Sequence, residues 1–163
     1  MKRLFAACLV PLLVAAAPAP AGNPQVDFAG FASLTDQVGS YRQQRLVDLK
    51  QFQTIAARPD ALVLDARSAD AFASGHIDGA VNLPLTDFAA GSLAAAIGSG
   101  DRPILIYCNN NFSNDQAPVR MKATALALNI QTFINLVGYG YRNVYELRDV
   151  VDFNDPKVHW IKG

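Results

Sequence analysis

The chain has very few of the residues that bind metals or form disulfides. Its 163 residues include only two cysteines, Cys8 and Cys108, and two histidines, His76 and His159. His159 has no histidine, cysteine or acidic cluster at ligand spacing, so the sequence predicts no metal site and no cofactor. The formal net charge is zero. The absence of a basic patch argues against binding to nucleic acid or to an anionic membrane.

The chain also lacks long hydrophobic runs, apart from one at its N-terminus. Met1-Lys2-Arg3 precedes an apolar stretch over residues 4–17, and Ala19-Pro20-Ala21 follows it. A basic start, an apolar stretch too short for a permanent membrane anchor and a small-x-small site predict a secretory signal peptide over residues 1–21. We expect cleavage after Ala21 and export of the mature protein, to the periplasm in a bacterium, without further association with a membrane.

Removal of this segment changes the cysteine content. Cys8 leaves with it, and Cys108 becomes the single cysteine of a chain in an oxidising compartment. One cysteine cannot form an internal disulfide, so the Cys108 thiol is free, modified or paired with another molecule. Loss of Lys2 and Arg3 reduces the 14 basic residues to 12, against 14 acidic ones.

The remaining residues are enough for one domain with a hydrophobic core. Val26, Phe28, Phe31 and Leu34 alternate with Gly, Ser and Asp. We expect residues 22–44 to form an irregular or partly helical arm that packs Phe28 and Phe31 onto a domain spanning residues 45–163.

Strand and helix patterns alternate along that domain. Short runs of β-branched and other apolar residues predict strands, and apolar residues at helical spacing after Asp or Ser predict helices. The expected strands lie at 45–47, 62–64, 104–107 and 143–147, with another short strand that stops at Pro84. The expected helices lie at 49–57, at 69–73, from Thr86 or Asp87 to residue 97 with a break at 98–100, and at 131–137, the last capped by Asn129. Residues 119–130 are expected to be helical in part. This order predicts an α/β fold in which helices cover both faces of a parallel sheet.

Cys108 comes directly after the strand at 104–107. Ligands of open α/β sheets bind at the carboxyl ends of the strands, so this position favours a functional thiol over a small buried hydrophobe, the alternative for any cysteine. Asn109, Asn110 and Asn111 tolerate unusual backbone angles and can turn main-chain N–H groups inward. We predict that they form a substrate-binding cradle around the sulfur, together with the next two residues, Phe112 and Ser113.

Two stretches resemble the rhodanese-like domain family, over roughly residues 46–147. The first is similar to its D-x-R, acidic-x-aromatic and G-H-I-x-G-A-x-N-[IL]-P signature. It consists of Leu64-Asp65-Ala66-Arg67, Asp70-Ala71-Phe72 and Gly75-His76-Ile77-Asp78-Gly79-Ala80-Val81-Asn82-Leu83-Pro84. The second is Ile104-Leu105-Ile106-Tyr107-Cys108, followed later by Tyr141-Arg142-Asn143-Val144-Tyr145-Glu146-Leu147.

The resemblance implies a three-layer α/β/α domain with a central five-stranded parallel sheet. It also implies that Cys108 accepts a sulfane sulfur from a small-molecule donor and passes it to a thiol or to cyanide. Only a thiolate attacks, and an ordinary cysteine with a pKa of roughly 8.5 is mostly protonated at neutral pH. Inward N–H groups and a helix N-terminus can stabilise the anion without a charged side chain.

The active-site loop departs from the family pattern. An arginine or lysine usually follows the cysteine by five residues, and here that residue is Ser113. The next basic residue is Arg120, and the chain from Cys108 to Asn143 is about 15 residues longer than usual, which predicts an insertion between residues 114 and 130. Arg120 and Lys122 are candidates for binding an anion over the pocket, or they form a solvated face. The inference of the fold survives this departure. The inference that thiosulfate is the donor does not, because the basic side chain that would help to hold a divalent anion is absent from its expected place.

Three other residues of the signature are expected to have structural rather than catalytic roles. Asp65 and Arg67 are expected to join loop ends at the edge of the sheet. His76 is a candidate general base, but in this motif we expect a turn residue that hydrogen-bonds to main chain.

Three functions stay open at this point. The first is an exported sulfurtransferase or persulfide carrier that uses Cys108. The second is a cysteine-dependent phosphatase, which needs an arginine to close its phosphate cradle. The third is an inactive binding or sensing module, in which the inserted segment contacts a protein partner or lines a small-molecule pocket.

Overall fold

The computed structural model describes residues 22–98 and 101–163. The expected signal peptide, residues 1–21, lies outside the described residues, as does part of the expected break at 98–100. Within the described part of the chain, no helix has both the length and the apolar character needed to cross a membrane.

A five-stranded, all-parallel sheet forms the centre of the molecule, as predicted. Its strand order is β1-β6-β5-β2-β4, so that β5 is the middle strand and its neighbours are β2 and β6. Every residue of β2 and β5 is buried, which explains their uninterrupted apolar sequences. The strands are β1 (Leu46–Val47), β2 (Leu62–Asp65), β4 (Val81–Asn82), β5 (Ile104–Tyr107) and β6 (Val144–Leu147).

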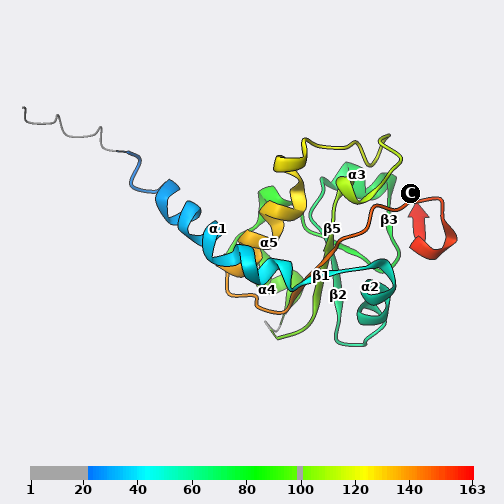
Figure 1. Cartoon of the computed structure of the whole chain (residues 1–163), viewed down its shortest axis with the longest axis horizontal. Coiled ribbons are helices and arrows are strands. Elements are labelled where there is room, and N and C mark those ends of the chain that lie inside the picture. Colours follow the sequence, from blue (N-terminus) through cyan, green and yellow to red (C-terminus); the bar gives the residue numbers. More distant parts are fainter. Residues whose placement is uncertain (1–21, 99–100) are drawn as a thin grey trace, which may run out of the picture.

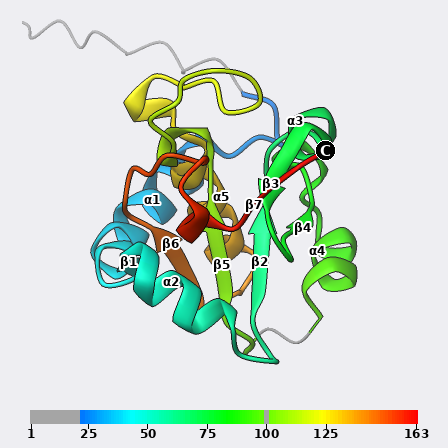
Figure 2. The ribbon, with the colours of Figure 1, turned by 90° about the vertical axis from the view of Figure 1, so that its right-hand side faces the viewer.

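Helices α1 (Phe28–Gln43), α4 (Ala90–Ile97) and α5 (Leu128–Gly138) cover one face of the sheet. Val38 from α1, Leu93 from α4 and Phe133 from α5 belong to one buried cluster with the sheet residues Leu64 and Ile106. Figures 1 and 2 show these helices on the side of the sheet opposite α2.

The second face is covered by α2 (Leu49–Ala56) and by an aromatic cluster. Phe52 of α2 is almost fully buried against this face. The cluster consists of Tyr107, Phe112, Phe153 and Trp160, whose rings meet edge to face or stacked at centroid distances of 5.0–6.4 Å. The result is the three-layer α/β/α arrangement expected from the sequence.

The predicted caps are confirmed at two helices. Asp48 begins α2 with a capping box, in which its side chain accepts the Gln51 N–H and the Gln51 side chain accepts the Asp48 N–H. Ser68 begins α3 (Ala69–Ser74), and Gly75 ends it. Gly75 has a φ of 157°, and an added Cβ would lie 2.6 Å from the Trp160 indole nitrogen, so the packing requires glycine there.

The C-terminal segment, which the sequence analysis did not assign, forms a second small sheet. Strand β7 (Trp160–Lys162) pairs antiparallel with β3 (Gly75–Ile77), just before the turn at Gly79 that leads into β4. Figure 2 shows this pair beside the central sheet. The tail thereby packs Trp160 against the buried cluster on the second face of the sheet.

The expectation for the N-terminal arm was wrong in its contacts. Phe28 and Phe31 are 80% and 46% exposed. The arm is a 16-residue helix that packs through Leu34, Val38 and Tyr41. These residues follow one another at helical spacing, and the Leu34 side chain lies so close to Gly138 of α5 that a Cβ there would be 3.0 Å away.

The inserted segment contains less helix than expected. Before α5 it has only a short 3₁₀ turn, Thr124–Leu126. The prediction that Asn129 caps the following helix was wrong, because α5 begins at Leu128 after Ala127 as its N-cap. Asn129 is buried, and its side chain donates to Asn111 over 2.9 Å.

Candidate functional site

Cys108 lies at the carboxyl end of the central strand β5, where the sequence placed it. Its side chain is free and the residue is 1% exposed. Main-chain N–H groups of Asn129, Asn110 and Leu128 lower the pKa of the thiol, and Asn110 and Asn129 line the same cavity as Cys108. The sulfur therefore lies at the N-terminus of α5, a position at which the helix dipole and free N–H groups favour an anion.

Two opposing influences act on the pKa of the Cys108 thiol. Burial is the stronger and raises the pKa, and the nearby Glu146 carboxylate raises it further. The three N–H groups lower it, but they do not offset burial. In this structure, the neutral thiol is therefore the favoured form at neutral pH.

The three asparagines after Cys108 have different contacts. Asn109 donates to the Arg120 carbonyl, and Asn110 donates to the Lys122 carbonyl and accepts the Lys122 N–H. These two side chains hold the inserted segment against the cysteine loop. Asn111 is turned inward and is buried. Their roles toward a substrate stay predictions.

Phe112 and Ser113 lead the chain away from the cysteine. Phe112 is buried in the aromatic cluster. The Ser113 N–H donates to the Val151 carbonyl, and Phe112 forms a bridge with Val151. The structure thus places Phe112 in the core, where the sequence analysis had expected a cradle residue. The main-chain N–H groups of residues 128 and 129, far along the chain, act on the thiol and lower its pKa.

The basic residues of the inserted segment take different directions. Arg120 donates to the Asp115 carbonyl over 3.0 Å and does not line the cavity that contains Cys108. Lys122 lines a separate, larger cavity. Neither residue is positioned as the arginine of a phosphate cradle, which leaves the phosphatase alternative without a supporting contact.

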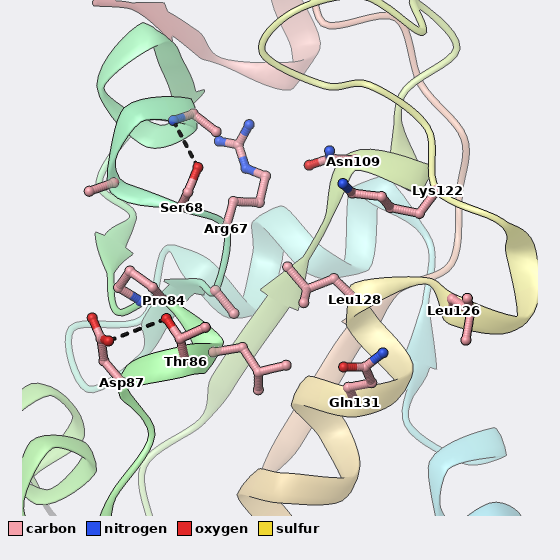
Figure 3. A pocket seen from close by; sticks show the side chains of 14 residues that line it. Arg67, Ser68, Pro84, Thr86, Asp87, Asn109, Lys122, Leu126, Leu128 and Gln131 are labelled. Atoms are coloured by element: carbon pink, nitrogen blue, oxygen red, sulfur yellow. Dashed lines mark hydrogen bonds between the residues drawn. The ribbon is translucent and has the colours of Figure 1, made fainter.

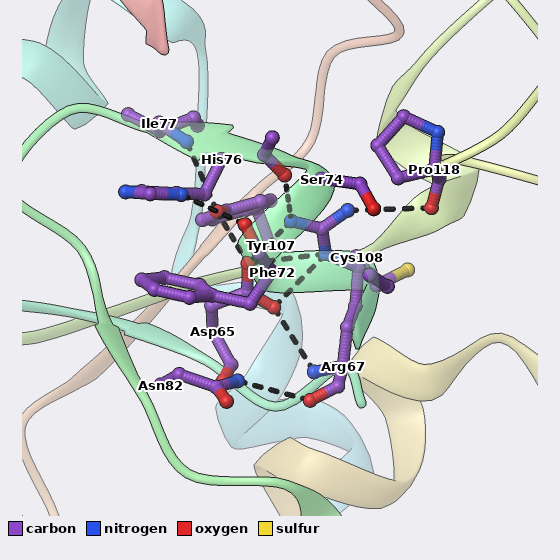
Figure 4. A network of polar contacts seen from close by, with 12 residues as sticks. Asp65, Arg67, Phe72, Ser74, His76, Ile77, Asn82, Tyr107, Cys108 and Pro118 are labelled. Carbon is purple, nitrogen blue, oxygen red and sulfur yellow. Dashed lines mark hydrogen bonds and ion pairs between the residues drawn. The ribbon is translucent and has the colours of Figure 1, made fainter. Parts of the chain in front are cut away.

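Asp65 and Arg67 form a buried ion pair next to the cysteine strand (Figure 4). Their closest atoms, Arg67 Nη2 and Asp65 Oδ2, are 2.6 Å apart, and Arg67 also donates to the Gly75 carbonyl. Tyr107 donates its hydroxyl proton to Asp65 over 2.6 Å and accepts the Ile77 N–H. The pair thus connects β2 to β3 (Gly75–Ile77). In Figure 4 the Cys108 sulfur is turned away from this network.

His76 lies on the far side of the same network. Its Nδ1 is 2.9 Å from the Phe72 carbonyl oxygen, and its ring stacks on the Phe72 ring with centroids 3.8 Å apart. The histidine therefore has a main-chain partner and an aromatic partner. No group of three or more His, Cys, Asp or Glu side chains in the described part of the chain is arranged to hold a metal ion.

Two cavities border the cysteine loop. The larger, about 610 Å³, lies between the loop after β2 and the inserted segment, and Cys108 is not among its lining residues (Figure 3). Its polar lining includes Ser68, Thr86, Asn109 and Lys122. The smaller, about 200 Å³, is lined by Cys108 together with Arg42, Glu146 and Arg148. We call it the cysteine hollow.

Sequence reasoning missed four residues of the site. Asn129 belongs to the inserted region, and its position could not be aligned with a family motif. Arg42 comes from α1, ahead of the recognisable signature. Glu146 and Arg148 lie at the carboxyl end of β6, the neighbour of β5. The only sequence signal for them was that ligands bind at the carboxyl ends of parallel strands.

Comparison with curated protein sequences gives no match. Among solved structures, the rhodanese-like domain of the Alr3790 protein from Anabaena sp. is 23% identical, with a TM-score of 0.43; the match covers 63% of this chain and 67% of that one. A rhodanese with anions from E. coli is 19% identical, with a TM-score of 0.42, covering 63% and 99%. Thiosulfate sulfurtransferase from Pseudomonas aeruginosa is 18% identical, with a TM-score of 0.46, covering 73% of this chain and 20% of that protein.

A protein-family model provides the decisive match. The model of the rhodanese-like domain matches residues 48–149, which include β2, the cysteine strand β5 and β6. This segment makes up more than half of the chain and contains four of the five parallel strands, β2, β4, β5 and β6, while β1 lies just before it. The chain therefore belongs to the rhodanese-like domain family.

Proposed function

We propose that this chain is an exported sulfurtransferase or persulfide carrier in which Cys108 accepts and releases a sulfane sulfur. The observation that carries the proposal is the position of the thiol at the end of β5, in a cavity that Asn110 and Asn129 also line. The main-chain N–H groups of Asn129, Asn110 and Leu128 lower the thiol pKa there. Such N–H groups stabilise a sulfur anion in place, without reorganisation during the reaction.

The reaction has two steps, which use the same anion-stabilising groups. In the first, the Cys108 thiolate attacks the outer sulfur of a donor such as thiosulfate. A new S–S bond forms, the S–S bond of the donor breaks, and sulfite leaves with the electron pair. In the second, cyanide or a thiolate attacks the outer sulfur of the Cys108 persulfide, which regenerates the thiolate and releases thiocyanate or a new persulfide.

Burial of the thiol sets a condition on this chemistry. Because the pKa of Cys108 is raised by burial and by Glu146, the proton must leave before attack. We expect the reaction rate to rise with pH through the thiol pKa, and a donor that enters the cysteine hollow to react with the minor thiolate fraction.

Intact-mass analysis tests the sulfur-transfer proposal directly. The purified chain, without residues 1–21, is incubated with thiosulfate and separately with an organic persulfide, and then with cyanide or a thiol. The expected result is a gain of one sulfur that the acceptor removes. Cys108→Ser and Cys108→Ala should gain none. Full sulfur transfer by both variants, or no gain by the unmodified chain, would contradict the proposal.

Export is a separate part of the proposal, and it depends on the sequence of residues 1–21. Cell fractionation of the full chain and N-terminal sequencing of the product test it. We expect a soluble exported form that begins at Gly22. A product that retains Met1 inside the cell would contradict export without affecting the sulfur chemistry.

A binding or sensing module is the second candidate, and the placement of the cavities favours it. Cys108 is 1% exposed, and the larger cavity does not include it. That cavity has one wall made by the inserted segment, so a small molecule or a protein partner would contact this segment. Alkylation of the folded chain discriminates between the candidates, because a module of this kind predicts a thiol that stays unreactive throughout the pH range of the folded state.

A further inference from the structure

Cys108 has no basic side chain where the family usually supplies one. Ser113 is bonded to Val151, and Arg120 is bonded to Asp115. Lys122 lines the larger cavity, which does not include Cys108. Any cation that meets an anionic donor at the sulfur must therefore come from outside the cysteine loop.

The cysteine hollow contains two such cations. It lies beside β6, and β6 is on the side of β5 opposite the strand that carries Asp65. Arg42 reaches it from α1 and Arg148 from the residue after β6. The hollow is about 200 Å³, smaller than the roughly 300–1,000 Å³ of sites that hold drug-sized ligands. It fits a donor of a few non-hydrogen atoms.

The two arginines have different partners. Arg42 forms a two-pronged ion pair with the buried Glu146, with Nε–Oε2 and Nη2–Oε1 distances of 2.7 and 2.5 Å. Its charge therefore offsets that of a carboxylate that lines the same hollow as the thiol. Among residues 22–98 and 101–163, Arg148 has only a loose contact, 3.6 Å from Nε to Asp149 Oδ1, and its side chain is 58% exposed. That distance is too long for a hydrogen bond, so the Arg148 guanidinium keeps its donors for a ligand.

We infer that the cysteine hollow is the anion entrance to Cys108, with Arg148 as the residue that binds the anionic group of a small sulfur donor. Arg42 is a positioning residue in this arrangement, because it holds Glu146 and offsets part of the negative charge that would repel such a donor. Helix α1, which precedes the segment matched by the family model, is thereby part of the site. The inference rests on the proposed function for the nature of the donor, but not for the charge selectivity of the hollow.

A pair of alkylating reagents tests that selectivity without sulfur transfer. Iodoacetate is anionic and iodoacetamide is neutral, and both alkylate the same thiolate. The ratio of their rate constants at Cys108 therefore reports the charge encountered on the way to the sulfur. In Arg148→Gln we expect the iodoacetate-to-iodoacetamide ratio to fall roughly threefold or more, as the loss of one nearby charge predicts. The KM for thiosulfate should rise while kcat changes little, since the arginine binds the donor before the reaction.

Arg58→Gln is the matched control. Arg58 has a similar exposure, 55%, and an ion pair with a neighbouring aspartate, Asp60, at 2.9 Å, and it does not line the hollow. Its substitution should leave the ratio unchanged. An unchanged ratio in Arg148→Gln, or equal falls in both variants, would overturn the inference.

The outcomes separate this inference from the proposed function. If neither reagent reacts with the folded chain, the hollow is not an entrance and the inference fails. If sulfur is gained from thiosulfate but the ratio does not depend on Arg148, the inference fails and the sulfurtransferase stands. If the ratio falls in Arg148→Gln and no donor loads Cys108, the anion entrance stands and the proposed function fails.

Discussion

The Asn111 side chain accepts the main-chain N–H of Cys108, over 2.9 Å from nitrogen to Oδ1. The amide nitrogen of the same side chain donates to the Leu147 and Asp149 carbonyls at the end of β6, over 2.7 and 3.0 Å. Asn129 donates to the same Oδ1. One buried side chain therefore fixes the cysteine loop to the neighbouring strand and to the start of α5.

Replacement of Asn111 by alanine should destabilise the domain strongly. The change leaves the buried N–H of Cys108 and two carbonyls without their partner, and we expect the free energy of unfolding to fall by about 2–4 kcal/mol. Urea denaturation measures it. Asn110→Ala is the control, because that side chain is bonded only to the main chain of the exposed Lys122; its expected loss is below about 1 kcal/mol. Equal losses would show that Asn111 is not the anchor.

The parallel sheet and the position of Cys108 were predictable because their signals are local. The uninterrupted apolar runs of β2 and β5, the capping pair Asp48 and Gln51, and the glycine that ends α3 each determine structure within a few residues. The family signature then added the strand count and the role expected of the cysteine.

The site was predictable only in part, because its other groups come from distant segments. Three consecutive asparagines have the same local preferences, and only the tertiary contacts assign Asn111 to the interior and its two predecessors to the inserted segment. Likewise, Phe28 is more hydrophobic than Val38, but the helix turns Val38 toward the sheet and leaves Phe28 in solvent. The pairing of β7 with β3 joins residues about 85 positions apart, for which no local signal exists.

Helix α1 should contribute to the stability of the domain through its inward face alone. Val38 is 4% exposed and belongs to the buried cluster between α1, α4, α5 and the sheet. Val38→Ala should therefore lower the free energy of unfolding by roughly 1–3 kcal/mol. Phe28→Ala removes a larger side chain, but one that is 80% exposed, and should change it by less than about 0.5 kcal/mol. Thermal or urea unfolding measures both. A larger effect at Phe28 would mean that the helix packs through its other face.

The reactivity of Cys108 should depend on the charge of Glu146. This carboxylate raises the thiol pKa, so Glu146→Gln should lower that pKa and shift the pH profile of iodoacetamide alkylation toward lower pH. Burial remains in the variant, and only the electrostatic part of the shift is removed. Asp60→Asn, which changes an exposed carboxylate paired with Arg58, should leave the profile unchanged. A shift to higher pH in Glu146→Gln would contradict the effect assigned to the carboxylate.

Burial of Cys108 should also make the folded state sensitive to alkali. Because the thiol pKa is higher in the folded state than in the unfolded chain, both states are protonated below the ordinary thiol pKa of about 8.5, and the thiol then adds no pH dependence to stability. Above that pH the unfolded chain releases the proton while the folded protein retains it, so stability falls as the pH rises toward the folded-state pKa.

Comparison with Cys108→Ala isolates this effect. Tyr107 also has a raised pKa, which affects stability at still higher pH, but it is present in both proteins and cancels in their difference. We expect the stability advantage of the unmodified chain over Cys108→Ala, measured by urea denaturation, to be constant between about pH 6 and 8 and to shrink above about pH 8.5. A constant or growing advantage at high pH would mean that the thiolate is accommodated in the fold. The N–H groups of Asn110, Leu128 and Asn129 would then outweigh burial, and Cys108 would be a thiolate more readily than its 1% exposure implies.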